Sequence, residues 1–214
     1  MGQREQLLQL LHWRDDVQAQ LQQARKQQAR NRRAQQQRHP YQHPAILAGL
    51  DRVIQALQEE LAQAEAAIRE QVAQHDQVQQ THDQLLTVPG VGAHNAVVLL
   101  VQVWRWEVLT KGQGTAKGLT AFVGLDPTPH ESGTSVHRHA GISRQGDRRV
   151  RACLYMGALG ALRGDNPLHH FYTRLVGAGK AKQVALIAAA RKLLTWAWAI
   201  FHGHASFDAT RYAA

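Results

Sequence analysis

Apolar residues between Ile46 and Val72 recur at steps of three or four, and this spacing is the strongest constraint on what the chain can fold into. The series is Ile46, Leu50, Val53, Leu57, Leu61, Ala64, Ile68 and Val72. Its mean step of about 3.7 residues is closer to an ordinary amphipathic helix than to a 3.5-residue heptad seam. We therefore predict a long helix over this range.

A second long helix is predicted over residues 3–38, which are rich in the helix formers Gln, Arg, Ala and Leu. The segment His39–Pro44 holds two prolines and separates the two helices. Residues 1–81 are thus expected to form a long helical hairpin, or coiled coil. A helical pair buries little apolar surface by itself, so we expect it to pack on another copy of the chain.

The first helix loses its apolar face after Arg25, where six Lys/Arg occur without an acid up to Arg38. Two interpretations stay open for this strip: a solvated helix end, or a surface that faces nucleic acid.

Charge is concentrated in the second part of the chain. The 214 residues hold 25 Lys/Arg and 16 Asp/Glu, a net charge of +9. Residues 81–214 hold 15 Lys/Arg against 7 Asp/Glu and therefore carry +8 of it. This balance favours an anionic partner, with nucleic acid ahead of membrane.

The cysteine content and the hydropathy of the sequence indicate the cellular compartment that we expect for the protein. Cys153 is the single cysteine, so no intramolecular disulfide forms and a reducing compartment fits. Met1 leads into a polar Gln-rich stretch rather than a signal peptide, and Arg191-Lys192 interrupt the longest apolar segment. We expect a cytoplasmic protein with no membrane partner.

Residues 82–104 predict a short helix, a tight turn at Pro89–Gly92 and a second helix. The pattern resembles a helix-hairpin-helix motif, in which glycines bring backbone N–H groups close to a phosphate at the start of the second helix. Gly90, Gly92 and His94 are the DNA-binding candidates here. The alternative is an αα-hairpin packed in a core.

Further helices are predicted over residues 115–123, 147–162, 167–176 and 182–201, with a small hairpin near Thr134, Val136 and Ile142. The fold class is thus mainly α. We expect a compact helical domain over residues 82–204 and a loose tail over 205–214.

The segment from Gly124 to Arg151 places Ser132-Gly133 in a loop rich in proline and histidine. Arginines follow it at Arg144, Arg148, Arg149 and Arg151. A hydroxyl nucleophile near several guanidinium groups suits attack on a phosphodiester. On local composition alone, a turn serine with solvated arginines is the commoner arrangement.

The thirteen histidines do not predict a zinc site, because few carboxylates and no cysteine accompany the densest group, His130, His137 and His139. Phosphate contact or surface exposure fits them better. Trp104, Trp106, Trp196 and Trp198 are expected to be core or interface anchors.

The order of motifs along the chain resembles the C-terminal half of the IS one-ten family of insertion-sequence transposases, the bridge-RNA-guided recombinases. The motifs are LTVPGVG at 86–92, AFVGLDP at 121–127, ESG at 131–133, GISRQGDRRVR at 141–151 and RKLL at 191–194. In that family a RuvC-like domain with metal-binding carboxylates comes first, then a coiled coil, then this helical domain.

The resemblance implies that Ser132 is the catalytic nucleophile, which would form a covalent phosphoserine link to DNA in a tetrameric synapse. It also implies Mg²⁺ bound by carboxylates of another subunit, and a guide RNA. This chain departs from the pattern in lacking the carboxylate domain. We therefore expect no metal site and no cofactor in the chain, and no cleavage by the chain alone.

The sequence thus predicts the DNA-binding, serine-bearing part of a site-specific transposase, with Gly133 and the four arginines near the scissile phosphate. The alternative is a non-catalytic DNA- or RNA-binding module, a truncated transposase, that dimerises through its long helices.

Overall fold

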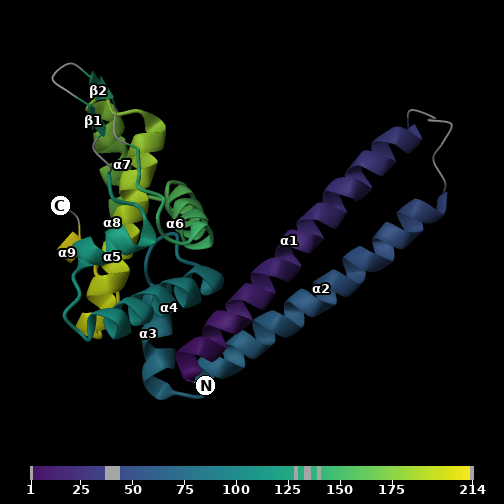
Figure 1. The fold of residues 1–214 in the computed structure, drawn as a ribbon, viewed down its shortest axis with the longest axis horizontal. Coiled ribbons are helices and arrows are strands. Elements are labelled where there is room, and N and C mark those ends of the chain that lie inside the picture. The colour runs from purple at the N-terminus through teal and green to yellow at the C-terminus, as the bar shows by residue number, and fades with distance from the viewer. Residues whose placement is uncertain (1, 37–43, 128–129, 133–135, 139–140, 213–214) are drawn as a thin grey trace. The chain divides into compact units, whose positions relative to one another are not determined.

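The protein is described by a computed structural model that covers residues 2–36, 44–127, 130–132, 136–138 and 141–212. The fold is mainly α, as the sequence predicted (Figure 1). The chain divides into two compact units, Met1–His75 and Asp76–Ala214.

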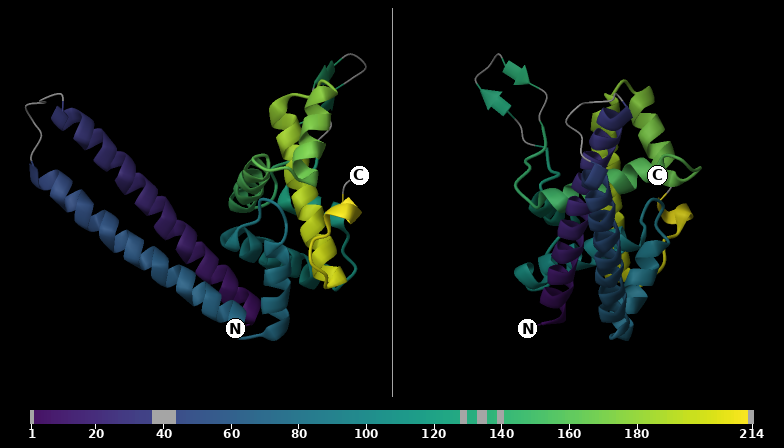
Figure 2. Two further views of the ribbon diagram at one scale, coloured as in Figure 1. Left: turned by 180° about the vertical axis from the view of Figure 1, so that it is seen from behind. Right: turned by 90° about the vertical axis from the view of Figure 1, so that its right-hand side faces the viewer.

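The first unit is a helical hairpin made of α1 (Gln3–Gln36) and α2 (Pro44–Ala73), which lie side by side over their length (Figure 2). Leu21 and Ala24 of α1 pack against Ile54 of α2, with Leu57 and Leu61 partly buried beside them. The Arg14 guanidinium lies 3.2 Å from the Glu65 carboxylate and links the two helices through an ion pair.

The predicted apolar stripe of α2 is only partly buried. Ile68 and Val72 are 6% and 2% exposed, whereas Ile46 and Val53 are 43% and 49% exposed. Part of the apolar face therefore meets solvent in the single chain.

The second unit is built around α8 (Lys182–Gly203), which packs against the helices α3, α4, α5, α6 and α7. Their bounds are α3 (Asp76–Leu86), α4 (Ala93–Thr110), α5 (Ala116–Val123), α6 (Arg148–Ala161) and α7 (Pro167–Gly177). Leu193, Leu194 and Trp196 of α8 are at most 2% exposed.

Among the described residues, α8 alone is long and apolar enough to cross a membrane. Half of its most apolar window is buried against the other helices of the unit, which is the arrangement of a core helix.

Local capping explains where several of these helices begin. The Thr115 hydroxyl accepts from Gly118 N at 3.1 Å, and the Asp147 carboxylate accepts from Arg149 N at 2.7 Å. Asn166 caps α7 through bonds from Leu168 N and His169 N, and Pro167 occupies the first turn.

The structure differs from the predicted domain bounds at two places. The units divide between His75 and Asp76 rather than at residue 81, because α3 packs on α4 and α8. The expected loose tail is held down: Phe207 packs on Trp196 with ring centroids 4.7 Å apart, its N–H donates to the Thr87 hydroxyl, and α9 (Ala209–Tyr212) follows. The Thr87 hydroxyl lies 120 residues before Phe207, and a partner so distant in sequence gives no local signal.

Candidate functional site

The connection from α5 to α6 is a two-stranded ribbon with a well-bonded base. Gly124 ends α5 at φ 75°, and its carbonyl accepts from Arg144 N at 3.1 Å. Ser143 N donates to the Asp126 carbonyl at 3.0 Å, and its hydroxyl donates to the Asp126 carboxylate. A bridge between Pro127 and Ile142 follows. Residues 15 to 20 positions apart in sequence are therefore held side by side.

The ribbon continues as β1 (His130–Ser132) and β2 (Val136–Arg138), which pair antiparallel with Ser132 opposite Val136. The small hairpin that the sequence predicted is thus present. Ser132 is the last residue of β1, and Gly133, the second residue of the predicted Ser-Gly step, lies outside the described residues, as do Thr134 and His139.

Three of the predicted arginines lie where the ribbon returns to the helices. Arg144 sits at the ribbon base in the left-handed region at φ 58°, and its side chain is exposed. Arg148 and Arg149 form the first turn of α6, and both side chains are exposed. The structure therefore gathers these three at the junction of β2 and α6, with Ser132 further along the ribbon.

Arg151 differs from the other three arginines because it is half-buried. Its guanidinium donates to the Val123 carbonyl at 3.2 Å and to the Gly146 carbonyl, and so joins the end of α5 to the start of α6. The backbone at Gly146 packs against the end of α5 with no room for a side chain, because a Cβ there would lie 2.3 Å from the Phe122 carbonyl oxygen. The spacing of arginines along the sequence does not separate this structural role from phosphate contact.

The turn between α3 and α4 contains both predicted glycines, in different surroundings. Gly90 has φ 82°, and a Cβ there would lie 2.2 Å from the Gly157 carbonyl oxygen of α6. Gly92 is the N-cap of α4 at φ −92°, and a Cβ there would meet nothing within 4 Å. Gly90 therefore serves packing against α6, while the backbone at Gly92 is open to solvent.

Residues that the sequence analysis did not single out hold this turn in place. Asn95 Nδ2 makes long bonds of 3.5 Å to the Gly90 and Cys153 carbonyls, and its Oδ1 accepts from the Cys153 thiol. In the sequence, Gly157 is the residue that indicates this close contact, because a glycine inside a helical pattern often marks a close backbone approach. His94 lies half-buried in the first turn of α4.

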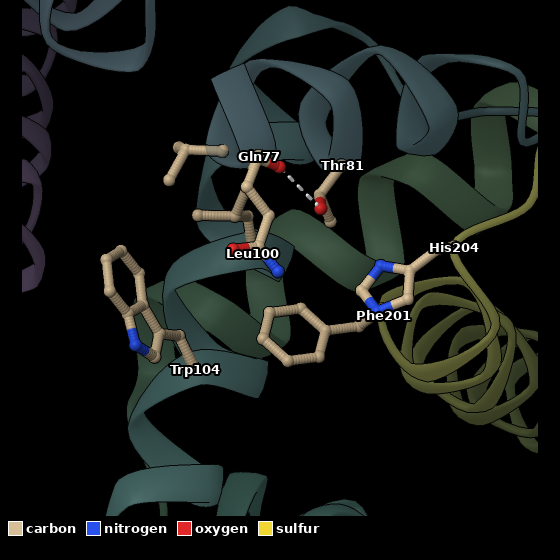
Figure 3. A pocket seen from close by; sticks show the side chains of 7 residues that line it. Gln77, Thr81, Leu100, Trp104, Phe201 and His204 are labelled. Carbon is tan, nitrogen blue, oxygen red and sulfur yellow. Dashed lines mark hydrogen bonds between the residues drawn. The ribbon is translucent and has the colours of Figure 1, made fainter. Parts of the chain in front are cut away.

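A cavity of about 160 Å³ lies between α3, α4 and α8, lined mainly by apolar side chains such as Leu100, Trp104 and Phe201 (Figure 3). Thr81 lines it too, but its hydroxyl donates to the Gln77 carbonyl at 2.9 Å. None of the predicted site residues contributes to this cavity.

In the part of the chain that the structure describes, no group of three or more His, Cys, Asp or Glu side chains could hold a metal ion. The described residues therefore do not fit a resident magnesium site.

The sequence matches known proteins over the segment that carries this geometry. The family model described as "Transposase IS116/IS110/IS902 family" matches residues 82–173. The pilin gene-inverting protein of Moraxella bovis is 34% identical over 129 residues, which cover 58% of this chain and 38% of that protein.

Two insertion-element proteins are also similar. The 43.6 kDa protein of insertion element IS110 from Streptomyces coelicolor is 34% identical over 116 residues, covering 52% of this chain and 26% of its own length. The 42 kDa protein of IS900 from Mycobacterium paratuberculosis is 29% identical over 166 residues, covering 76% and 39%.

The chain spans two fifths or less of the length of these relatives. The matched residues run from α3 through the ribbon and α6 into α7, and so include Ser132 and all four predicted arginines. Residues 82–173 therefore match a transposase region of the IS116/IS110/IS902 family, as the order of the motifs predicted.

Proposed function

We propose that this chain is the serine-bearing half of a site-specific transposase, in which Ser132 attacks a DNA phosphodiester. The observation that carries the proposal is that one family match covers the serine strand, the ribbon base and the arginine-rich start of α6. The relatives support it, since their names include a gene-inverting protein and proteins of insertion elements.

In the proposed step the Ser132 Oγ gives up its proton and forms a bond to phosphorus. The bond from phosphorus to the leaving deoxyribose oxygen breaks, and that oxygen takes up a proton. The product is a phosphoserine diester and one free DNA hydroxyl. A serine hydroxyl is a poor nucleophile at neutral pH, so the step needs an activating group.

Arg144, Arg148 and Arg149 are proposed to stabilise negative charge on the non-bridging oxygens of the phosphate. Their exposed side chains at the ribbon base support this role. Arg151 is proposed to position them, because its two bonds to carbonyl oxygens join α5 to the loop before α6. Gly133, next to the nucleophile, is proposed to let the DNA backbone approach closely.

Activation of the serine is proposed to come from Mg²⁺-binding carboxylates of a RuvC-like domain outside this sequence. We therefore expect no strand cleavage by this chain alone, and cleavage when the carboxylate domain is supplied.

A further DNA contact is proposed at the start of α4. The open backbone at Gly92 and the neighbouring His94 would meet a DNA phosphate, while Gly90 holds the turn against α6. Duplex binding of this kind should carry little sequence preference and should weaken with salt.

The proposed assembly is a cytoplasmic homo-oligomer, a dimer or tetramer, with a guide RNA in the complete enzyme. A second function, a non-catalytic DNA- or RNA-binding module that dimerises through α1 and α2, is favoured by the exposed apolar residues of α2.

The test is to trap a protein–DNA adduct in the full-length context, with the carboxylate domain and guide RNA present. Ser132→Ala should abolish the adduct and keep DNA affinity within a few-fold, because it removes one neutral hydrogen bond at most. Ser135→Ala is the matched control and should form the adduct normally.

Mass spectrometry of the trapped peptide locates the linkage. A DNA link on Ser135, Ser143 or Tyr155 would show that Ser132 is not the nucleophile. Binding of DNA with no adduct under any full-length condition would support the non-catalytic module instead.

A further inference from the structure

Helices α7 and α8 bring two cations together over one aromatic ring. The Lys192 Nζ lies 4.5 Å from the centroid of the Phe171 ring, and the Arg174 Cζ lies 5.6 Å from the same centroid. Lys192 also lies 5.6 Å from the ring of Trp196. The negative face of an aromatic ring attracts cations, so Phe171 holds both groups near each other.

Two positive charges held close together repel each other, so this arrangement is electrostatically unfavourable within the protein. Partial burial, and then the positive charge of Arg174, lower the pKa of the Lys192 ammonium. The Arg174 guanidinium adds a second positive charge, and partial burial removes water from the Lys192 ammonium. A bound anion would therefore stabilise the charged form of Lys192. Arg174 itself is exposed, so the pair can be reached from solvent.

The sequence around this pair extends the positive charge. Residues 166–207 contain Arg174, Lys180, Lys182, Arg191 and Lys192, and no Asp or Glu. Asp165 lies just outside this segment, and its carboxylate is bonded to His170 Nε2 at 2.6 Å. Five cations without a carboxylate in this segment favour a polyanion over a single small anion.

We propose that Phe171, Arg174 and Lys192 form a phosphodiester clamp on the α7–α8 surface, which binds the backbone of a nucleic acid away from the reacting phosphate. This inference rests on the proposed nucleic-acid function. The ring positions the two cations, and the guanidinium and ammonium donate to phosphate oxygens. The contact reads no bases, because both donors address the backbone.

The clamp is distinct from the residues proposed for the reaction. Its members lie on α7 and α8, whereas Ser132 lies on β1 and the reactive-site arginines lie at the start of α6. The clamp therefore strengthens binding and fixes the position of the nucleic acid along the protein, and it does not touch the reacting atoms.

The first measurement is the salt dependence of nucleic-acid binding by the full chain. The double variant Arg174→Gln/Lys192→Gln should lower the slope of log K against log salt by roughly 1.8, since each lost contact to duplex DNA changes it by roughly 0.9. The control Lys111→Gln/Lys117→Gln removes two exposed cations at α4 and α5 and should keep the wild-type slope. Thermal melting of each variant checks that it is folded.

The second measurement uses the wild-type chain and no substitution. Amine acylation of Lys192, followed by mass spectrometry, should slow several-fold when nucleic acid is bound, while Lys117 reacts unchanged. Separate arms with duplex DNA and with single-stranded RNA identify which nucleic acid occupies the clamp. Inorganic phosphate at matched ionic strength should give no protection.

The outcomes separate this inference from the proposed function. If the wild type binds nucleic acid with a steep salt slope, but Lys192 is not protected and the double variant keeps the slope, the clamp is wrong and the proposed function stands. Protection by poly-glutamate but by neither nucleic acid would overturn it in favour of an acidic protein partner. If neither nucleic acid binds at low salt, both proposals fall.

Discussion

At the scale of single residues, Gly90 and Gly92 belong to one turn but lie in different surroundings. Gly90 combines a positive φ with a Cβ position 2.2 Å from the Gly157 carbonyl oxygen. We predict that Gly90→Ala lowers the free energy of unfolding by about 1–3 kcal/mol, because the added methyl forces α6 away from the turn. Urea unfolding followed by circular dichroism measures the change.

The matched variant is Gly92→Val. Its φ of −92° is ordinary for valine and the Cβ position is open, so only the weaker N-cap should cost stability, roughly 1 kcal/mol. If DNA approaches this backbone, Gly92→Val should weaken binding more than it weakens folding. A large drop in melting temperature with unchanged affinity would assign Gly92 to packing as well.

At the scale of elements, Asn166 ties the end of α6 to the start of α7. Its Oδ1 accepts from Leu168 N and His169 N, and its Nδ2 donates to the Ala161 carbonyl at 2.7 Å. We predict that Asn166→Ala lowers the free energy of unfolding by about 1–2 kcal/mol through loss of the cap. Thermal or urea unfolding of the purified chain measures the loss.

Asn166→Ser is the control for this junction, because serine caps a helix about as well as asparagine but cannot donate to Ala161 in the same way. It should destabilise less than Asn166→Ala. Equal stability of Asn166→Ala and the wild type would mean that the junction is held by the packing of Leu168, which is fully buried, rather than by the cap.

At the scale of the whole molecule, the helical hairpin is expected to join copies of the chain. Ile46 and Val53 are one heptad apart on α2 and are 43% and 49% exposed. We predict that the chain self-associates, and that Ile46→Glu/Val53→Glu lowers the mass measured by light scattering while the helix content is kept. Burial of these side chains between copies would supply the driving force.

The control Ala48→Glu/Gln58→Glu adds the same two charges at exposed positions elsewhere on α2. It should leave the measured mass unchanged. A wild-type chain that stays monomeric at tens of micromolar would contradict self-association.

The helices are the elements that local sequence predicts best. The step of three and four residues in α2 depends on neighbours within one turn, so its helix followed from local spacing. The starts of α5, α6 and α7 lie within one residue of the predicted ones, and their caps Thr115, Asp147 and Asn166 act on N–H groups only two or three residues away. The family also followed from motif order along the chain.

The roles of individual side chains depended instead on partners distant in sequence. Arg151 belongs to the same basic run as Arg148, and only the carbonyls of Val123 and Gly146 give it a structural role. Phe171 and Lys192 lie 21 positions apart and meet because α7 folds back on α8. The sequence by itself determined the helical class, the helix starts and the family, because local spacing and order encode them. The tertiary structure alone decided which glycine packs, which arginine is buried and which cations converge, because these depend on contacts between distant segments.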